Sequence, residues 1–254
     1  IAKFVPRFGH LPFVMGEGNK KLSKRNPESN LFLHRDRGFI REGLLNYLAL
    51  LGWSISADRD IFTLDEMCKT FDVASVNPNP ARFDQKKADA INASHIRLLS
   101  DEDFQDRVIP YLLSAGILPP QPTGEQLADL SKALPLVKER ITVLSEASGM
   151  LAFLFTEDLS FEQEALAQLP SEAGKIASTA AQALAELSDF TTENIQAKLS
   201  EALIERAGLK PRDAFAVVRV AVSGRRVTPP LFECLEILGK ERSVGRLEAF
   251  SKAH

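Results

Sequence analysis

The sequence has 254 residues, of which 44% are hydrophobic and 26% charged, and its formal net charge is −3. This length allows two or three small domains, and the composition excludes large-scale disorder. There is no apolar run of the roughly 18 residues that a membrane span needs, and the first residues lack the features of a signal peptide. Two separated cysteines and four histidines argue against a structural zinc site and favour a reduced, cytoplasmic setting.

Charge is unevenly distributed along the chain. Residues 19–41 carry seven basic and two acidic side chains, and residues 210–246 carry eight basic and four acidic ones. Residues 150–205 carry ten acids and only two lysines. This segregation suits a protein that presents selected faces to a polyanion, with ordinary solvated helix faces as an equally weighted alternative.

Only the first 25 residues lack a helical pattern. They form a short apolar stretch, a glycine-rich loop and a basic cluster, which together resemble the end of an α/β domain. The proline-rich segment 117–124 is the clearest internal boundary. We therefore expect domains at 1–25, 26–118 and 119–254, with a softer sub-boundary near residue 156.

Helical periodicity dominates the chain after Asn30, so we expect a mainly α fold. Apolar residues at helical spacing predict a helix that is closed by Gly52. Capping boxes that begin at Thr63 and Thr123 predict two further helix N-termini. Another helix is expected over 86–99.

Two residues in this part of the chain are expected to interrupt helices. Ser94 is a candidate break between two shorter helices within 86–99. Pro110 lies inside the next apolar segment and is expected to end or kink it.

The last third of the chain predicts five helices with clear start and stop signals. Thr192 is expected to cap the second of them and Pro211 to open the third, because these residue types favour helix N-termini. The expected ranges are 173–187, 193–207, 211–222, a helix that starts at 228–230 and ends at Gly239, and 240–250.

The richest chemical motif is the basic cluster at Lys21, Ser23, Lys24 and Arg25, which follows Gly16 and Gly18. Glycines let the backbone approach a ligand closely, and lysines three apart supply point positive charges to a triphosphate. Ser23 can donate to a phosphate oxygen. An isolated motif of this kind is more often a plain basic surface loop.

The match to a known family is much longer than this motif. The stretch FGHLPFVMGEGNKKLSKR (8–25) resembles the KMSKS region of class I aminoacyl-tRNA synthetases, in the form used by bacterial-type glutamyl-tRNA synthetases. The segments at 26–54, 79–96 and 229–247 also resemble this family, in the same order. The resemblance therefore covers nearly the whole chain and is highly specific.

The resemblance implies the C-terminal half of an enzyme that attaches glutamate to tRNA with ATP and Mg²⁺, through glutamyl-adenylate. It implies a fold that is mainly α: the tail of an α/β Rossmann-like catalytic domain, a helical connecting domain and all-α anticodon-binding domains. By the same resemblance Lys21 and Lys24 contact the ATP phosphates, and Ser23 and Arg25 support the loop. Arg219, Thr228 and Leu231 match positions that face anticodon bases. For Arg219 the alternative is a paired surface arginine, and for Leu231 it is core packing.

One position bears on tRNA specificity. Family members that accept only the glutamate tRNA often have an arginine directly before a Thr-Leu pair, and Thr142 occupies that place here. Thr142 cannot supply the same donor fork, which hints at an enzyme that also accepts the glutamine tRNA. A shifted register, with Arg140 as the equivalent residue, is the alternative.

Several expectations concern what the chain lacks. The family's first ATP motif has HxGH-type spacing, and the four histidines do not form it. We therefore expect that this chain alone does not form glutamyl-adenylate. A stand-alone tRNA-binding module and a structural role for a truncated paralogue are the competing readings. The partners expected are tRNA, glutamate and ATP, with no DNA, no membrane and no metal site, in a cytoplasmic monomer.

Overall fold

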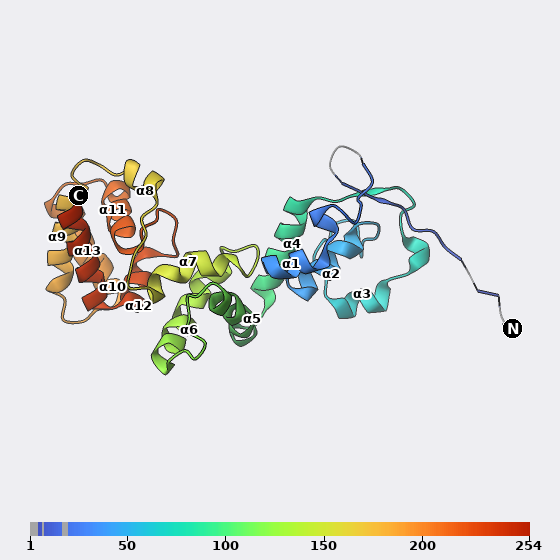
Figure 1. Ribbon diagram of the computed structural model, residues 1–254, viewed down its shortest axis with the longest axis horizontal. Helices are drawn as coiled ribbons and strands as arrows, with labels where there is room; N and C mark the ends of the chain where they lie inside the picture. The colour runs from blue at the N-terminus through green and yellow to red at the C-terminus, as the bar shows by residue number, and fades with distance from the viewer. Residues whose placement is uncertain (1–4, 7, 17–19) are drawn as a thin grey trace. The chain divides into compact units, whose positions relative to one another are not determined.

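The computed structural model describes residues 5, 6, 8–16 and 20–254 (Figure 1). This part of the chain is mainly helical, and it contains two short strands, β1 (Val14–Met15) and β2 (Ala81–Arg82). The expected mainly α fold is therefore confirmed. None of the helices described combines the length and the apolar character needed to cross a membrane.

The chain packs as two compact units. Unit 1 consists of Ile1–Phe104 and Ile141–Glu146, and unit 2 consists of Gln105–Arg140 and Ala147–His254. The domain boundaries expected near residues 25, 118 and 156 stay predictions.

Unit 1 is built around helices that pack on one small apolar core. The elements are α1 (Leu31–Arg37), α2 (Arg41–Leu50), α3 (Leu64–Thr70) and α4 (Gln85–Leu98), with 3-10 turns η2 (Pro27–Ser29) and η3 (Val73–Ser75). Helix α2 packs against α4 around the buried side chains of Phe39, Tyr47 and Ile91. The capping box at Thr63 is confirmed, since its side chain accepts from the backbone of Glu66 and the Glu66 carboxylate accepts from Thr63.

Segment 141–146 returns to unit 1 and is fixed there by buried polar contacts. The Asn92 side chain donates to the carbonyl of Thr142 at 2.6 Å and accepts from the backbone N–H of Ile40 at 2.9 Å. The N–H of Leu144 donates to the carbonyl of Gly38 at 3.0 Å. Gly38 has a φ of +95°, and a Cβ there would lie 2.5 Å from the Leu144 nitrogen, so only glycine fits.

The expectation that Ser94 breaks its helix was wrong. Helix α4 runs through Ser94, whose hydroxyl donates to the Ala90 carbonyl at 3.0 Å within the same helix. Pro110 lies inside helix α5 (Asp101–Ser114) and does not end it, so of the two outcomes expected for Pro110 only the kink stays a prediction. Phe104 and Leu112 of this helix are fully buried, and such tertiary packing supplies most of the stability of a helix.

Unit 2 is a helical assembly. Its further elements are α6 (Gly124–Lys138), α7 (Glu146–Phe155), α8 (Gln163–Ala167), α9 (Ala173–Ala185), α10 (Thr192–Leu199), the π-helical segment η4 (Ser200–Arg206), α11 (Pro211–Ser223), α12 (Leu231–Leu238) and α13 (Lys240–Ala253). Helix α13 packs along α9, α10 packs against α12, and α11 contacts both α9 and α13. The capping box at Thr123 is confirmed, as are the predicted start of α11 at Pro211 and its end at Gly224.

The prediction of Thr192 as the N-cap of α10 was wrong, because the N-cap lies one residue earlier. Thr191 occupies the N-cap position of α10, and its side chain makes no capping hydrogen bond. The backbone N–H of Thr192 donates to the carboxylate of Glu236 at 2.7 Å, and its hydroxyl donates to the same oxygen. Glu236 of α12, 44 residues away in the sequence, therefore accepts a hydrogen bond at this helix N-terminus in place of a local capping side chain.

Candidate functional site

The basic loop of unit 1 is anchored by its backbone to strand β1. The N–H of Leu22 donates to the carbonyl of Val14 at 2.8 Å, and the N–H of Gly16 donates to the carbonyl of Lys20 at 2.8 Å. Strand β1 in turn pairs in parallel with β2, with Val14 opposite Ala81. Gly18, the second glycine of the predicted motif, lies outside the residues described.

A local turn organises the second half of the loop around Asn26. Both the backbone N–H and the hydroxyl of Ser23 donate to the Asn26 side-chain oxygen, at 3.0 and 2.9 Å. The backbone N–H of Arg25 donates to the Ser23 hydroxyl at 3.3 Å, and the hydroxyl of Ser29 donates to the Ser23 carbonyl at 2.8 Å. The turn leaves Lys24 and Arg25 on the surface.

The predicted phosphate-binding side chains lie together on this loop and are all exposed: Lys21, Ser23, Lys24 and Arg25. The Lys21 ammonium lies 3.7 Å from the centre of the Phe13 ring, which is a cation–π contact. Lys24 and Arg25 have no ion-pair partner within the part of the chain described. Cations without an ion-pair partner in that part of the chain can meet an anionic ligand without first breaking an ion pair there.

In unit 2, Arg219 and Thr228 come together. Nη1 of Arg219, on α11, donates to the Thr228 hydroxyl and to the Pro229 carbonyl, the latter at 2.9 Å. The Thr228 hydroxyl donates to the same carbonyl at 2.8 Å. Thr228 is buried and Arg219 is half-buried, and burial lowers the pKa of the Arg219 guanidinium.

A surface cavity of about 300 Å³ lies beside Arg219. Its other charged and aromatic lining residues are Arg212, Phe215 and Arg226. None of these three residues was predicted from the sequence. The signal for two of them was present, because Arg212 and Phe215 precede Arg219 at helical spacing and share one face of α11 with it. Arg226 comes from the loop after α11, and its position depends on tertiary packing.

Leu231 lies apart from this surface. Its side chain is 5% exposed and belongs to the core of unit 2, which favours the core-packing alternative for this residue. Its neighbour Cys234 is also buried, and burial raises the pKa of that thiol to about 12, so the thiol stays protonated and unreactive.

Thr142, the candidate specificity residue, lies in unit 1. Its backbone N–H donates to the carboxylate of Glu146 at 2.7 Å, and its hydroxyl donates to the same group at 3.1 Å. Arg140, the residue favoured by the shifted register, is exposed and belongs to unit 2. Thr142 and Arg140 therefore stay two separate candidates for contact with tRNA.

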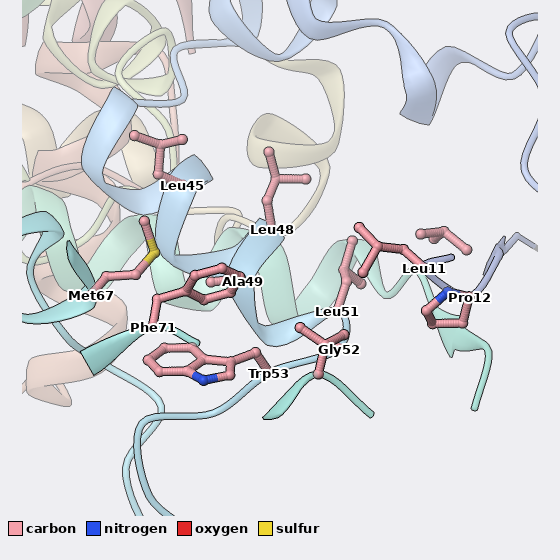
Figure 2. Close-up of a pocket in the computed structure, with 12 residues that line it drawn as sticks. Leu11, Pro12, Leu45, Leu48, Ala49, Leu51, Gly52, Trp53, Met67 and Phe71 are labelled. Carbon is pink, nitrogen blue, oxygen red and sulfur yellow. The ribbon is translucent and has the colours of Figure 1, made fainter. Parts of the chain in front are cut away.

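Unit 1 also contains an apolar pocket of about 460 Å³. Figure 2 shows Trp53, Met67 and Phe71 on one part of its wall and Leu11 and Pro12 on another. No charged side chain lines it, so it offers no groups for acid–base or phosphate chemistry. Within the residues described, no cluster of three His, Cys, Asp or Glu side chains is arranged to hold a metal ion.

Two protein families match this sequence. Residues 103–251 match the family described as "Anticodon binding domain", which covers more than half of the chain. The chain belongs to the anticodon-binding domain family. Residues 1–90 match the family "tRNA synthetases class I (E and Q), catalytic domain". The basic loop thus falls in the catalytic-domain match, and the Arg219 cluster falls in the anticodon-binding domain.

The individual relatives that match are glutamate–tRNA ligases. The chain is 59% identical over 251 residues to a glutamate–tRNA ligase of Saccharopolyspora erythraea, which covers 98% of this chain and 50% of the relative. A glutamate–tRNA ligase of Kineococcus radiotolerans is 59% identical over 249 residues, covering 97% of this chain and 50% of the relative. The predicted resemblance to bacterial-type glutamyl-tRNA synthetases is confirmed. The chain spans about half the length of the curated relatives it matches.

A solved structure has the same fold. The crystal structure of a glutamate–tRNA ligase from Elizabethkingia meningosepticum, in complex with its amino acid, matches with a TM-score of 0.82 and 26% identity. The match covers 98% of this chain and 52% of that one.

Proposed function

We propose that this chain supplies the tRNA-reading part and one ATP-binding loop of a glutamate–tRNA ligase, which attaches glutamate to tRNA through glutamyl-adenylate. The observation that carries the proposal is the Arg219 cluster within an anticodon-binding domain. Nη1 of Arg219 is fixed by Thr228 and Pro229, and its Nε and Nη2 have no hydrogen-bond partner in the part of the chain described. Arg219 also lines the surface cavity of about 300 Å³ described above.

This geometry suits recognition of a base edge. A guanidinium has five N–H donors, and fixing one nitrogen leaves a planar fork for a ligand. Because the protein already holds the group in one orientation, little further rotamer entropy is lost on binding. RNA-binding proteins read unstacked bases by such hydrogen bonds and by stacking on aromatic or arginine planes, and Phe215 with Arg212 and Arg226 line the same cavity.

For ATP, we propose that Lys21 and Lys24 stabilise negative charge on the phosphates, with Ser23 and Arg25 supporting them. In adenylation, charge builds on the α-phosphate and on the departing pyrophosphate, where positioned ammonium groups stabilise the transition state. The exposure of Lys24 and Arg25 supports this role. Mg²⁺ arrives with ATP, and we assign no metal ligand to this chain. The enzyme acts as a cytoplasmic monomer in this proposal.

The proposal is tested by tRNA binding to the 254-residue chain. We expect tighter binding of a glutamate tRNA than of the same tRNA with an altered anticodon. Phosphate contacts should make both affinities fall steeply between about 50 and 200 mM salt. Equal affinity for the two tRNAs at every salt concentration would contradict anticodon reading.

We further propose that the enzyme accepts the glutamine tRNA as well as the glutamate tRNA, because Thr142 cannot present an arginine fork. Thr142→Arg should then weaken glutamine tRNA binding more than glutamate tRNA binding. Thr142→Ser keeps the hydroxyl that donates to Glu146 and is the matched control. A wild-type chain that already rejects the glutamine tRNA would contradict relaxed specificity.

A further inference from the structure

Arg246, on α13, holds the ends of two helices with one guanidinium. Its Nη1 donates to the carbonyls of Phe153 and Val222, both at 2.8 Å, and its Nη2 donates to the carbonyl of Thr156. Phe153 and Thr156 lie at the C-terminal end of α7, and Val222 lies in the last turn of α11. Burial lowers the pKa of Arg246 to about 10, so the group is still charged at neutral pH.

The charge and shape of arginine both matter at this point. The last carbonyls of a helix have no partner within that helix and carry the negative end of its dipole, so one cation between two C-termini stabilises both. Two nitrogens of one planar group donate to the three carbonyls. Lysine has the same charge but carries its donors on a single nitrogen, so it lacks the second point from which Arg246 donates.

The same helix end carries the Arg219 site. The Ser223 hydroxyl donates to the carbonyl of Arg219 at 2.6 Å, which ties Arg219 to the last turn of α11. The chain reverses at Gly224, whose φ is +74° and whose carbonyl accepts from the N–H of Glu162 at 2.9 Å. A side chain at Gly224 would collide with the Ser160 carbonyl. The orientation of Arg219 therefore depends on how the end of α11 is fixed against the 153–162 segment.

We propose that Arg246 is a positioning residue for anticodon reading: by holding the C-terminus of α11 to the C-terminus of α7, it sets the orientation of Arg219. This inference rests on the proposed function of the Arg219 cluster. Arg246 touches no ligand in this role. Its loss reduces discrimination between anticodons while leaving the contribution of phosphate contacts to affinity intact.

Arg242 offers a matched control on the same helix. Its Nη1 donates to the carbonyl of Leu154 at 3.0 Å and its Nε to the carbonyl of Leu238 at 2.8 Å. It therefore also stabilises the end of α7, but it makes no hydrogen bond to α11. Arg242→Lys and Arg246→Lys both weaken a carbonyl-capping arginine, and only the second loosens the helix that carries Arg219.

The experiment measures dissociation constants of the 254-residue chain for a glutamate tRNA and for the same tRNA with an altered anticodon. In the Arg246→Lys variant, the ratio of the two constants should fall about fivefold or more, the lower end for losing one base contact. The affinity of this variant for the altered tRNA should equal that of the wild-type chain. Arg242→Lys should keep the wild-type ratio, and thermal melts of both variants report any general loss of stability.

Combining Arg246→Lys with Arg219→Ala tests whether Arg246 acts through Arg219. The double variant should show the same ratio as Arg219→Ala alone. An unchanged ratio in Arg246→Lys, or an equal fall in Arg242→Lys, would overturn the positioning role. If the wild-type chain itself fails to discriminate between the two tRNAs, the proposed function fails, and this inference fails with it.

Discussion

The basic loop of unit 1 and the Arg219 cluster of unit 2 are held in opposite ways. The loop is fixed by its backbone to β1 and by a local turn at Asn26, and its charged ends stay exposed. Arg219 is half-buried, and its guanidinium is locked by groups nine and ten residues away in the chain. The difference suggests that ligand phosphates complete the order of the loop, whereas the Arg219 fork is organised before its ligand arrives.

The largest expected effect concerns the loop. In the full-length ligase of the proposed function, Lys24→Ala should lower kcat for glutamate activation by about 10²-fold or more, the scale for losing one preorganised donor to developing charge. ATP–pyrophosphate exchange measures this rate. The thermal stability should not change, because Lys24 is exposed and has no ion-pair partner in the part described. A wild-type rate would mean that the loop is only a basic surface cluster.

The second prediction concerns Arg219. Arg219→Ala should cost roughly 1–3 kcal/mol of binding free energy for the cognate tRNA, the range for a bidentate base contact. It should also lower the melting temperature, because the hydroxyl of buried Thr228 loses a donor. The loss of affinity should shrink for an anticodon-altered tRNA, and additive losses in this two-by-two cycle would remove the base-reading role.

Arg206→Ala is the control for the charge of Arg219. Arg206 is exposed in the same unit and pairs with Glu201, so its replacement removes one positive charge without touching the cavity. An equal loss of affinity in both variants would mean that Arg219 acts only through long-range attraction to phosphate.

The elements that the sequence predicted best are those with local causes. Both capping boxes follow from a threonine and an acid or amide three residues later, and both helices begin where that pattern places them. Gly208 and Gly224 end their helices for an equally local reason, since each has the positive φ that glycine tolerates.

The misses have tertiary causes. Nothing near Thr192 in the sequence indicates that Glu236 would bind it, and no local rule shows that α5 would continue past Pro110. The same holds for the candidate site. The resemblance pointed to Arg219 and Thr228, but their direct hydrogen bond and the cavity with Arg226 depend on how α11 and the following loop pack.

The third prediction tests a group that tertiary packing holds inside unit 1. The ring of buried His95 lies 2.7 Å from the Asn46 side-chain oxygen, which also accepts from the N–H of Phe62 at 3.1 Å. Burial lowers the pKa of His95, with a smaller opposing effect from Glu42. The unfolded chain therefore binds a proton here more readily than the folded one, and stability falls as the pH drops through the unfolded pKa of about 6.5.

Urea unfolding at pH 7.5 and pH 5.5 measures this dependence. His95→Ala should cost about 1–2 kcal/mol at pH 7.5, from the broken hydrogen-bond network, and should reduce the loss of stability on acidification. His10→Ala removes an exposed imidazole and controls for the loss of one histidine. If His95→Ala loses as much stability on acidification as the wild type, the pH dependence arises from other groups.

The smallest expected effect tests a cap that local sequence sets. Thr63→Ala should lower the free energy of unfolding by about 1 kcal/mol, the usual value for an N-cap. Thr63→Ser should restore most of this loss because serine keeps the accepting oxygen.

The Glu66 carboxylate completes this box, and the Thr63 N–H together with Arg59 lowers the pKa of Glu66 to about 2. Its contribution is therefore complete above the unfolded pKa of about 4.5 and is lost as the pH falls through about 2. Glu66→Gln keeps the box, as Gln126 does in the second capping box, but removes the titrating group.

Thermal melts of these variants at pH 7 and pH 3 should separate the contribution of the threonine cap from that of the Glu66 charge. The loss of stability in Thr63→Ala appears at pH 7, and Glu66→Gln removes part of the pH dependence. A Thr63→Ala variant as stable as the wild type would mean that α3 is held by its packing against α2 and that its cap adds nothing.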